Sequence, residues 1–188
     1  MGKIIKKIIK FVLVLIIVVL NVLIWGRIYI SSDAPITKKV IVEQNIQDDM
    51  KKNPMSYSVK EFFPTITMDS LGKLQMRYVT YIKELSDLQF TLKYNIDYFK
   101  NNTPLNFAVR HIRGEEQTIY DDIYRMTQDR YIFRYLRFSC PIELQENDSV
   151  FVDVYTSDGN LFQTLLIVSP ETSSMDIKTV SIKTVVKN

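Results

Sequence analysis

The longest run of apolar side chains lies near the N-terminus. From Phe11 to Trp25 the chain carries no charge, and Asn21 is the one polar residue. A helix over these 15 residues would be about 22 Å long, which is shorter than the roughly 30 Å hydrocarbon core of a bilayer. Extending the helix over 8–28 brings its length to about 31 Å. The pattern therefore predicts a single transmembrane helix over 8–28.

Cationic and aromatic side chains at the two ends of this run support a membrane anchor. The anchoring residues that we expect are Lys6, Lys7, Lys10, Trp25 and Arg27. Long cationic side chains reach the lipid headgroups, and tryptophan favours the membrane interface. Four lysines precede the apolar run and one arginine follows it, which places the N-terminus in the cytoplasm. We expect a basic cytoplasmic tail over 1–10 and an extracytoplasmic chain from residue 31 onward.

A cleaved signal peptide is the alternative interpretation of the same pattern. Cleavage requires small residues at positions −3 and −1, and Ser32 and Ala34 are the pair that follows the run. Cutting after Ala34 would place Pro35 directly after the scissile bond, which is unfavourable. We therefore expect an anchor that is not removed.

The segment that follows the anchor is polar and mixed in charge. Residues 43–56 read EQNIQDDMKKNPMS and end in an Asn53-Pro54 pair, which favours a turn. We expect a stalk over 31–56, with a short strand at 37–42 or a helical turn near 45–52 as interruptions.

Beyond residue 57 the apolar positions recur with a period of two, as in half-buried strands. In 88–95 the apolar side chains Leu88, Phe90, Leu92 and Tyr94 alternate with polar ones. Similar patterns predict strands at 58–67, 74–82, 105–112, 131–138, 150–156, 161–168 and 176–186. Asp158-Gly159 joins two of these strands and favours a tight hairpin turn.

The number and spacing of these strands indicate the fold class. Connections between them are too short for the helices of a parallel α/β fold, so an antiparallel sheet fold is favoured. We expect an immunoglobulin-like β-sandwich of about seven or eight strands over 57–188. The resemblance is one of architecture, because the paired cysteines of true immunoglobulin domains are missing.

Composition excludes several classes of function. Five of the 24 basic residues and none of the 21 acidic ones precede Ser31, so the rest of the chain has 19 basic and 21 acidic side chains. A nucleic-acid partner is not expected, because such proteins need a basic surface on the folded part. One cysteine cannot form a disulfide framework or a cysteine-built zinc site. We expect no metal and no cofactor.

Candidate catalytic residues are few. Cys140 and His111 are each the only residue of their kind, and a nucleophilic Cys/His pair is the first enzymatic possibility. Their positions in strand patterns favour a small buried thiol and an ordinary strand histidine. The acidic residues have no calcium-loop spacing. A pair of glycosidase carboxylates stays open, since any two acids can meet in space.

Tyrosine is abundant, and 114–129 is the longest segment without clear strand alternation. Ile119, Ile123 and Met126 have helical spacing, so a short helix is one interpretation. An exposed contact surface for a partner is the other, because tyrosine is frequent at interfaces. Its candidate contact residues are Tyr120, Asp121, Asp122 and Tyr124.

These patterns favour a non-enzymatic binding or scaffolding protein that is held in the cell membrane by one helix. We expect the bilayer and another envelope protein as partners, with the β-domain outside the cytoplasm. Twenty-three isoleucines against two alanines suggest an AT-rich bacterial genome. The alternatives are a cell-envelope hydrolase or transferase on the same sandwich, and a subunit of a secretion or division complex.

The missing cleavage site leads to a direct test. Protein extracted from membranes should have the mass of the whole chain, including 1–30. A mature N-terminus within 31–35 would show that the apolar run is a signal peptide.

Overall fold

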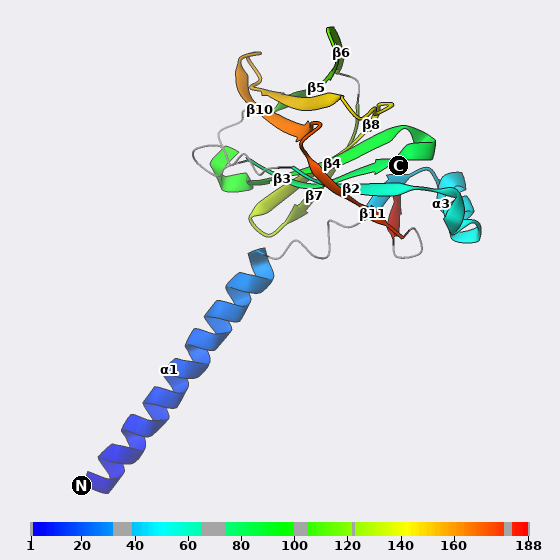
Figure 1. Cartoon of the computed structure of the whole chain (residues 1–188). Helices are drawn as coiled ribbons and strands as arrows, with labels where there is room; N and C mark the ends of the chain where they lie inside the picture. Colours follow the sequence, from blue (N-terminus) through cyan, green and yellow to red (C-terminus); the bar gives the residue numbers. More distant parts are fainter. Residues whose placement is uncertain are drawn as a thin grey trace. The chain divides into compact units, whose positions relative to one another are not determined.

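The protein is described here from a computed structural model (Figure 1). The structure describes residues 2–31, 39–64, 74–99, 105–121, 123–178 and 182–187. The chain divides into two compact units, Met1–Pro35 and Ile36–Asn188.

The first unit contains one helix, α1, at Gly2–Ser31. Within its segment Ile5–Tyr29, the most apolar window of 18 residues has a mean hydropathy of 3.0. As a helix, this segment of 25 residues is about 37 Å long, enough to cross a hydrocarbon core of roughly 30 Å. The expected helix over 8–28 is therefore confirmed as a helix that is long and apolar enough to span a membrane. All five expected anchoring residues lie in it with exposed side chains.

The second unit is rich in β-structure. Its strands are β1 Lys39–Val42, β2 Val59–Phe63, β3 Leu74–Ile82, β4 Asp87–Asn95, β5 Asn106–Arg113, β6 Glu116–Tyr120, β7 Tyr124–Arg130, β8 Phe133–Pro141, β9 Ser149–Tyr155, β10 Leu161–Val168, β11 Ser173–Ile177 and β12 Lys183–Val186. Helix α3 covers Gln44–Lys52, and short 3₁₀ turns lie at Pro54–Ser56, Lys83–Leu85 and Ile96–Phe99.

These strands form three sheets. A six-stranded sheet has the order β11-β2-β3-β4-β8-β7, and a four-stranded sheet has the order β10-β9-β5-β6. Every pairing in these two sheets is antiparallel. Strands β1 and β12 form a separate parallel pair. The expected antiparallel β-domain is confirmed. The immunoglobulin-like arrangement is not confirmed, and the twelve strands described exceed the seven or eight expected.

The main core lies between the two antiparallel sheets. Phe138 of the six-stranded sheet stacks on Phe90 of the same sheet at 4.8 Å and meets Phe107 of the four-stranded sheet at 5.0 Å between ring centroids. Aliphatic side chains from both sheets, such as Val79 and Val152, complete this fully buried layer. Period-two burial on one face of each sheet produces this core.

Strand β4 is confirmed over almost the range expected, but it is buried on both faces. Its polar side chains Gln89, Thr91 and Lys93 are as inaccessible as the apolar ones that alternate with them. The second face is therefore covered rather than open to solvent.

The cover comes from the segment expected to be a stalk. Val40 and Val42 of β1 and Met50 of α3 are buried and pack with Val59 and Ile82 of the six-stranded sheet. Residues 39–56, which were expected to be part of the stalk, thus belong to the folded unit. Helix α3 is polar because only one of its nine residues, Met50, is buried. This polar composition is also typical of a linker, which is why the sequence predicted a stalk.

Gln89 joins the cover to the sheet. Its side-chain Nε2 donates to the carbonyl oxygen of Ile41 at 2.6 Å, and its Oε1 accepts from the Ile41 N–H at 2.7 Å. Gln89 also donates to Asp87, which accepts a further hydrogen bond from Ser139 at 2.8 Å. Gln89 thereby satisfies the backbone N–H and carbonyl of Ile41 in β1, and Asp87 and Ser139 hold the Gln89 side chain in place.

Two local details differ from the expected alternation. A β-bulge after Arg77 gives Tyr78 a φ of 48° and moves the next core positions after Met76 to Val79 and Tyr81. Tyr131, the first residue of the strand expected over 131–138, lies in the turn before β8 with a φ of 54° and an exposed side chain. The Asp158-Gly159 hairpin is confirmed, with Gly159 at a φ of 83°.

Replacing Gln89 tests the role of this connection. Gln89→Ala leaves the buried N–H and carbonyl of Ile41 without partners, and each unsatisfied group costs about 1–3 kcal/mol. We expect the free energy of unfolding to fall by about 2–5 kcal/mol, measured by urea denaturation of the full chain in detergent. Gln128→Ala, at an exposed position of β7, is the control and should change it by less than about 0.5 kcal/mol.

Candidate functional site: a crossing strand, a buried ion cluster and a cavity

The segment expected to contact a partner crosses from one sheet to the other. Within Gly114–Asp129, β6 pairs with β5 in the four-stranded sheet, and β7 pairs with β8 in the six-stranded sheet. The helix interpretation is therefore wrong. Ile123 packs against the core, but Ile119 is 59% exposed, so the helical spacing of these side chains does not define a buried face.

The four candidate contact residues lie in different environments. Tyr120 is partly buried against the core, and this burial raises the pKa of its hydroxyl. Tyr124 is also partly buried, with the Lys187 ammonium 5.4 Å from the centre of its ring. Asp121 is exposed, and Asp122 lies outside the described residues. Neither tyrosine is a fully exposed anchor.

Strand β6 is the most exposed part of this segment. Among the strands that the structure describes, it is an edge strand of the four-stranded sheet and pairs with β5 (Figure 1). The side chains of its first four residues, including Ile119, are exposed on both faces of the strand. A strand that buries so little apolar surface contributes little to the core. Its free edge can hydrogen-bond to an added strand.

Cys140 and His111 do not form a nucleophilic pair. Cys140 lies in β8, fully buried in the main core, where burial raises the pKa of its thiol to about 12. His111 lies in β5, and its Nε2 is 2.8 Å from the Asp148 carboxylate. A thiol with so high a pKa is an unreactive one at neutral pH. The expected buried thiol and strand histidine are both confirmed.

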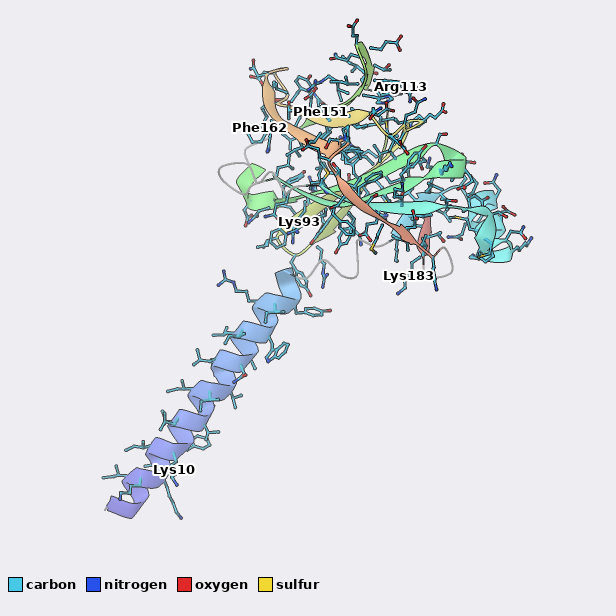
Figure 2. The ribbon with its side chains drawn as sticks, in the orientation of Figure 1. Lys10, Lys93, Arg113, Phe151, Phe162 and Lys183 are labelled. Carbon is cyan, nitrogen blue, oxygen red and sulfur yellow. The ribbon has the colours of Figure 1, made fainter. Side chains whose placement is uncertain are left out.

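Asp148 is the centre of a buried ion cluster at the end of the four-stranded sheet. Arg113, labelled in Figure 2, donates to its carboxylate from Nε at 3.1 Å and from Nη2 at 2.9 Å. The Gln145 N–H donates to it at 2.9 Å. Burial alone would raise the pKa of Asp148, but the hydrogen bonds from Arg113, Gln145 and His111 lower it to about 2. Sequence reasoning missed this cluster because its members lie about 35 residues apart.

Other acidic groups are also held by cations or hydrogen bonds. Asp153 accepts from the Nε of Arg110 at 2.8 Å, and this contact lowers the pKa of Asp153. Burial raises the pKa of Asp87, which is bound to Gln89 and Ser139. In the described ranges, no three His, Cys, Asp or Glu side chains gather as a metal site would require.

A cavity of about 290 Å³ lies between β1 and the second face of the six-stranded sheet. Ile41, Met175, Ile177 and Ile182 provide apolar walls, while Glu61 and Arg137 provide buried charged ones. The Nη2 of Arg137 donates to the Lys39 carbonyl oxygen. Neither charged residue of the wall was singled out by the sequence, because polar positions of a sheet face usually meet solvent.

Comparisons with known proteins add no functional information. No family model, no curated protein and no solved structure matches this chain. The residues described above therefore carry the functional argument.

The low pKa of Asp148 predicts how stability depends on pH. Because folding lowers this pKa from 3.8 to about 2, the folded state is stabilised above pH 4, and the contribution disappears as the pH falls toward 2. Its size is about 2 kcal/mol. Urea denaturation at pH 5 and pH 2.5 should show this loss in the wild type and a smaller one in Asp148→Asn. An equally steep loss in Asp148→Asn would contradict the assignment, and Asp121→Asn, at an exposed carboxylate, is the control.

Proposed function

We propose that this protein is a non-enzymatic, membrane-anchored binding module whose β-domain contacts another protein of the cell envelope. The observation that carries the proposal is strand β6, a strand at a sheet edge with both faces exposed. It lies in a chain whose N-terminal helix is apolar enough to span a membrane.

The anchor supports the proposed location. Lysines at one end of α1 and Trp25 with Arg27 at the other match the two interfaces of a bilayer. The excess of positive charge before the helix orients the N-terminus toward the cytoplasm. The β-domain is then extracytoplasmic, and seven residues, 32–38, connect the end of α1 to the start of β1.

The chemistry of the described side chains favours binding over catalysis. The thiol of Cys140 is buried, and the carboxylate of Asp148 is paired with Arg113 and in contact with His111. A hydrolase or transferase would need a nucleophile beside a base, or two carboxylates flanking an open groove. A role as a subunit of a secretion or division complex is one form of the same proposal.

The partner contact is proposed to lie along β6 and the crossing that follows it. Ile119 is the apolar anchor, and Tyr120, Asp121 and Tyr124 continue the surface toward β7. An added strand would pair with the free edge of β6, and its side chains would cover Ile119. This assignment moves the main anchor from the tyrosines to an isoleucine that the core does not use.

Site-specific photocrosslinking in native membranes tests this proposal. A photoreactive residue at position 119 should give a discrete adduct of higher mass. The same residue at Leu161 of β10, which is 58% exposed, should give none. Ile119→Asp should weaken the contact about thirtyfold, the scale of a 2 kcal/mol hot spot, without changing the melting temperature. Absence of an adduct at 119, or equal adducts at both positions, would contradict the proposal.

A further inference from the structure

The cavity under β1 contains two buried charges that do not meet each other. Arg137 is 4% exposed and Glu61 is 8% exposed, and both line the same space. The Nη2 of Arg137 donates to the Lys39 carbonyl oxygen, but its Nε–H has no acceptor within the described residues. Burying a charged group with unused hydrogen-bonding capacity is costly, so such groups usually have a partner.

The register of the sheet separates these two charges. Glu61 pairs with Thr80, and Thr80 pairs with Gln89 on the strand next to β8. Glu61 and Arg137 therefore belong to strands three intervals apart, which is about 14 Å across the sheet. No ion pair between them is found in the described part of the chain. One molecule that satisfied both would have to extend across the cavity.

The space between the two charges is apolar on one side and hydroxyl-bearing on the other. Ile41 lines it from β1, and Thr80 and Thr91 line it from β3 and β4 of the sheet. Met175 and Ile177 of the edge strand β11 continue the apolar wall beyond Glu61. Apolar side chains of a ligand can pack on the isoleucines, and its amides can hydrogen-bond to the threonine hydroxyls. The volume of about 290 Å³ is near the lower limit for small-ligand pockets.

We propose that this cavity binds a short apolar peptide with free ends, whose carboxylate contacts Arg137 and whose ammonium contacts Glu61. Three extended residues span about 10 Å, and the arginine and glutamate side chains cover the remaining distance. The carboxylate pairs with the charge of the Arg137 guanidinium, which forms part of the cavity wall. This binding site lies on the six-stranded sheet and is separate from the proposed partner contact at β6.

The experiment uses tri-alanine as the probe, because its small side chains fit a cavity of about 290 Å³, and the full chain in detergent as the protein. Isothermal titration should show binding of the peptide with free ends. Acetylation of its N-terminus removes the ammonium, and amidation of its C-terminus removes the carboxylate. Each change should weaken binding about tenfold or more, as expected for a lost charge-assisted hydrogen bond.

A substitution connects the peptide's ammonium to one residue. Glu61→Gln should weaken binding of the free peptide about tenfold and leave binding of the acetylated peptide unchanged. Glu171→Gln, at an exposed position outside the cavity, is the matched control and should change neither. The amidated peptide tests the Arg137 end without altering that residue, so a folding defect of an Arg137 variant does not affect the result.

Three results would overturn the proposal. They are no binding of tri-alanine at millimolar concentration, equal binding of free and capped peptides, and equal affinities of wild type and Glu61→Gln. None of them bears on the crosslinking result at position 119, so the two proposals fail independently.

Discussion

The fold depends on burial of a polar sheet face, which the hydrogen bonds between Gln89 and the backbone of Ile41 make possible. A sheet face with Asp87, Gln89, Ser139 and Arg137 would normally meet solvent. Here β1 covers it, and the polar side chains satisfy one another and the unused backbone groups of β1. Without these contacts the cover would leave the buried N–H and carbonyl of Ile41 unpaired, at a cost of about 1–3 kcal/mol each. The cover is therefore held by these polar contacts together with the apolar cluster that Val40, Val42 and Met50 form with the sheet.

Local pattern predicted the parts of this structure that depend on neighbouring residues. The period of two in 88–95 identified β4, and Asp158-Gly159 identified the hairpin of β9 and β10. The same pattern wrongly implied a solvated face for β4, because the covering strand lies 48 residues away in the sequence. The helix predicted within 114–129 was wrong for a related reason. Strands β6 and β7 form because they pair with β5 and β8, whereas their own side chains alternate poorly. Long-range pairing is invisible to periodicity.

The candidate sites show the same division between local and distant information. Cys140 and His111 were correctly assigned to strands, since their neighbours alternate around them. The contacts of His111 with Asp148 and of Glu61 with the cavity depend on register, which no single segment contains. Most buried acids described here have a cation or hydrogen-bond donor, as Asp148 and Asp153 do. Glu61 is an exception among these acids. It lines the same cavity as the buried Arg137, but no ion pair joins the two side chains in the described residues.

The cover also connects the two ends of the folded unit. Strand β1 is the first strand after the apolar helix, and β12 is the last strand of the chain, so almost the whole β-domain lies between them in sequence. The parallel pairing of β1 with β12 therefore joins two segments that are far apart in the sequence. Bringing them together costs the unfolded chain more conformational entropy than closing a local hairpin. Local hairpins such as β3–β4 and β9–β10 can form before it. Strand β1, which closes the cavity, therefore depends on the contacts that form last. It is also the strand that follows the proposed anchor most closely along the chain.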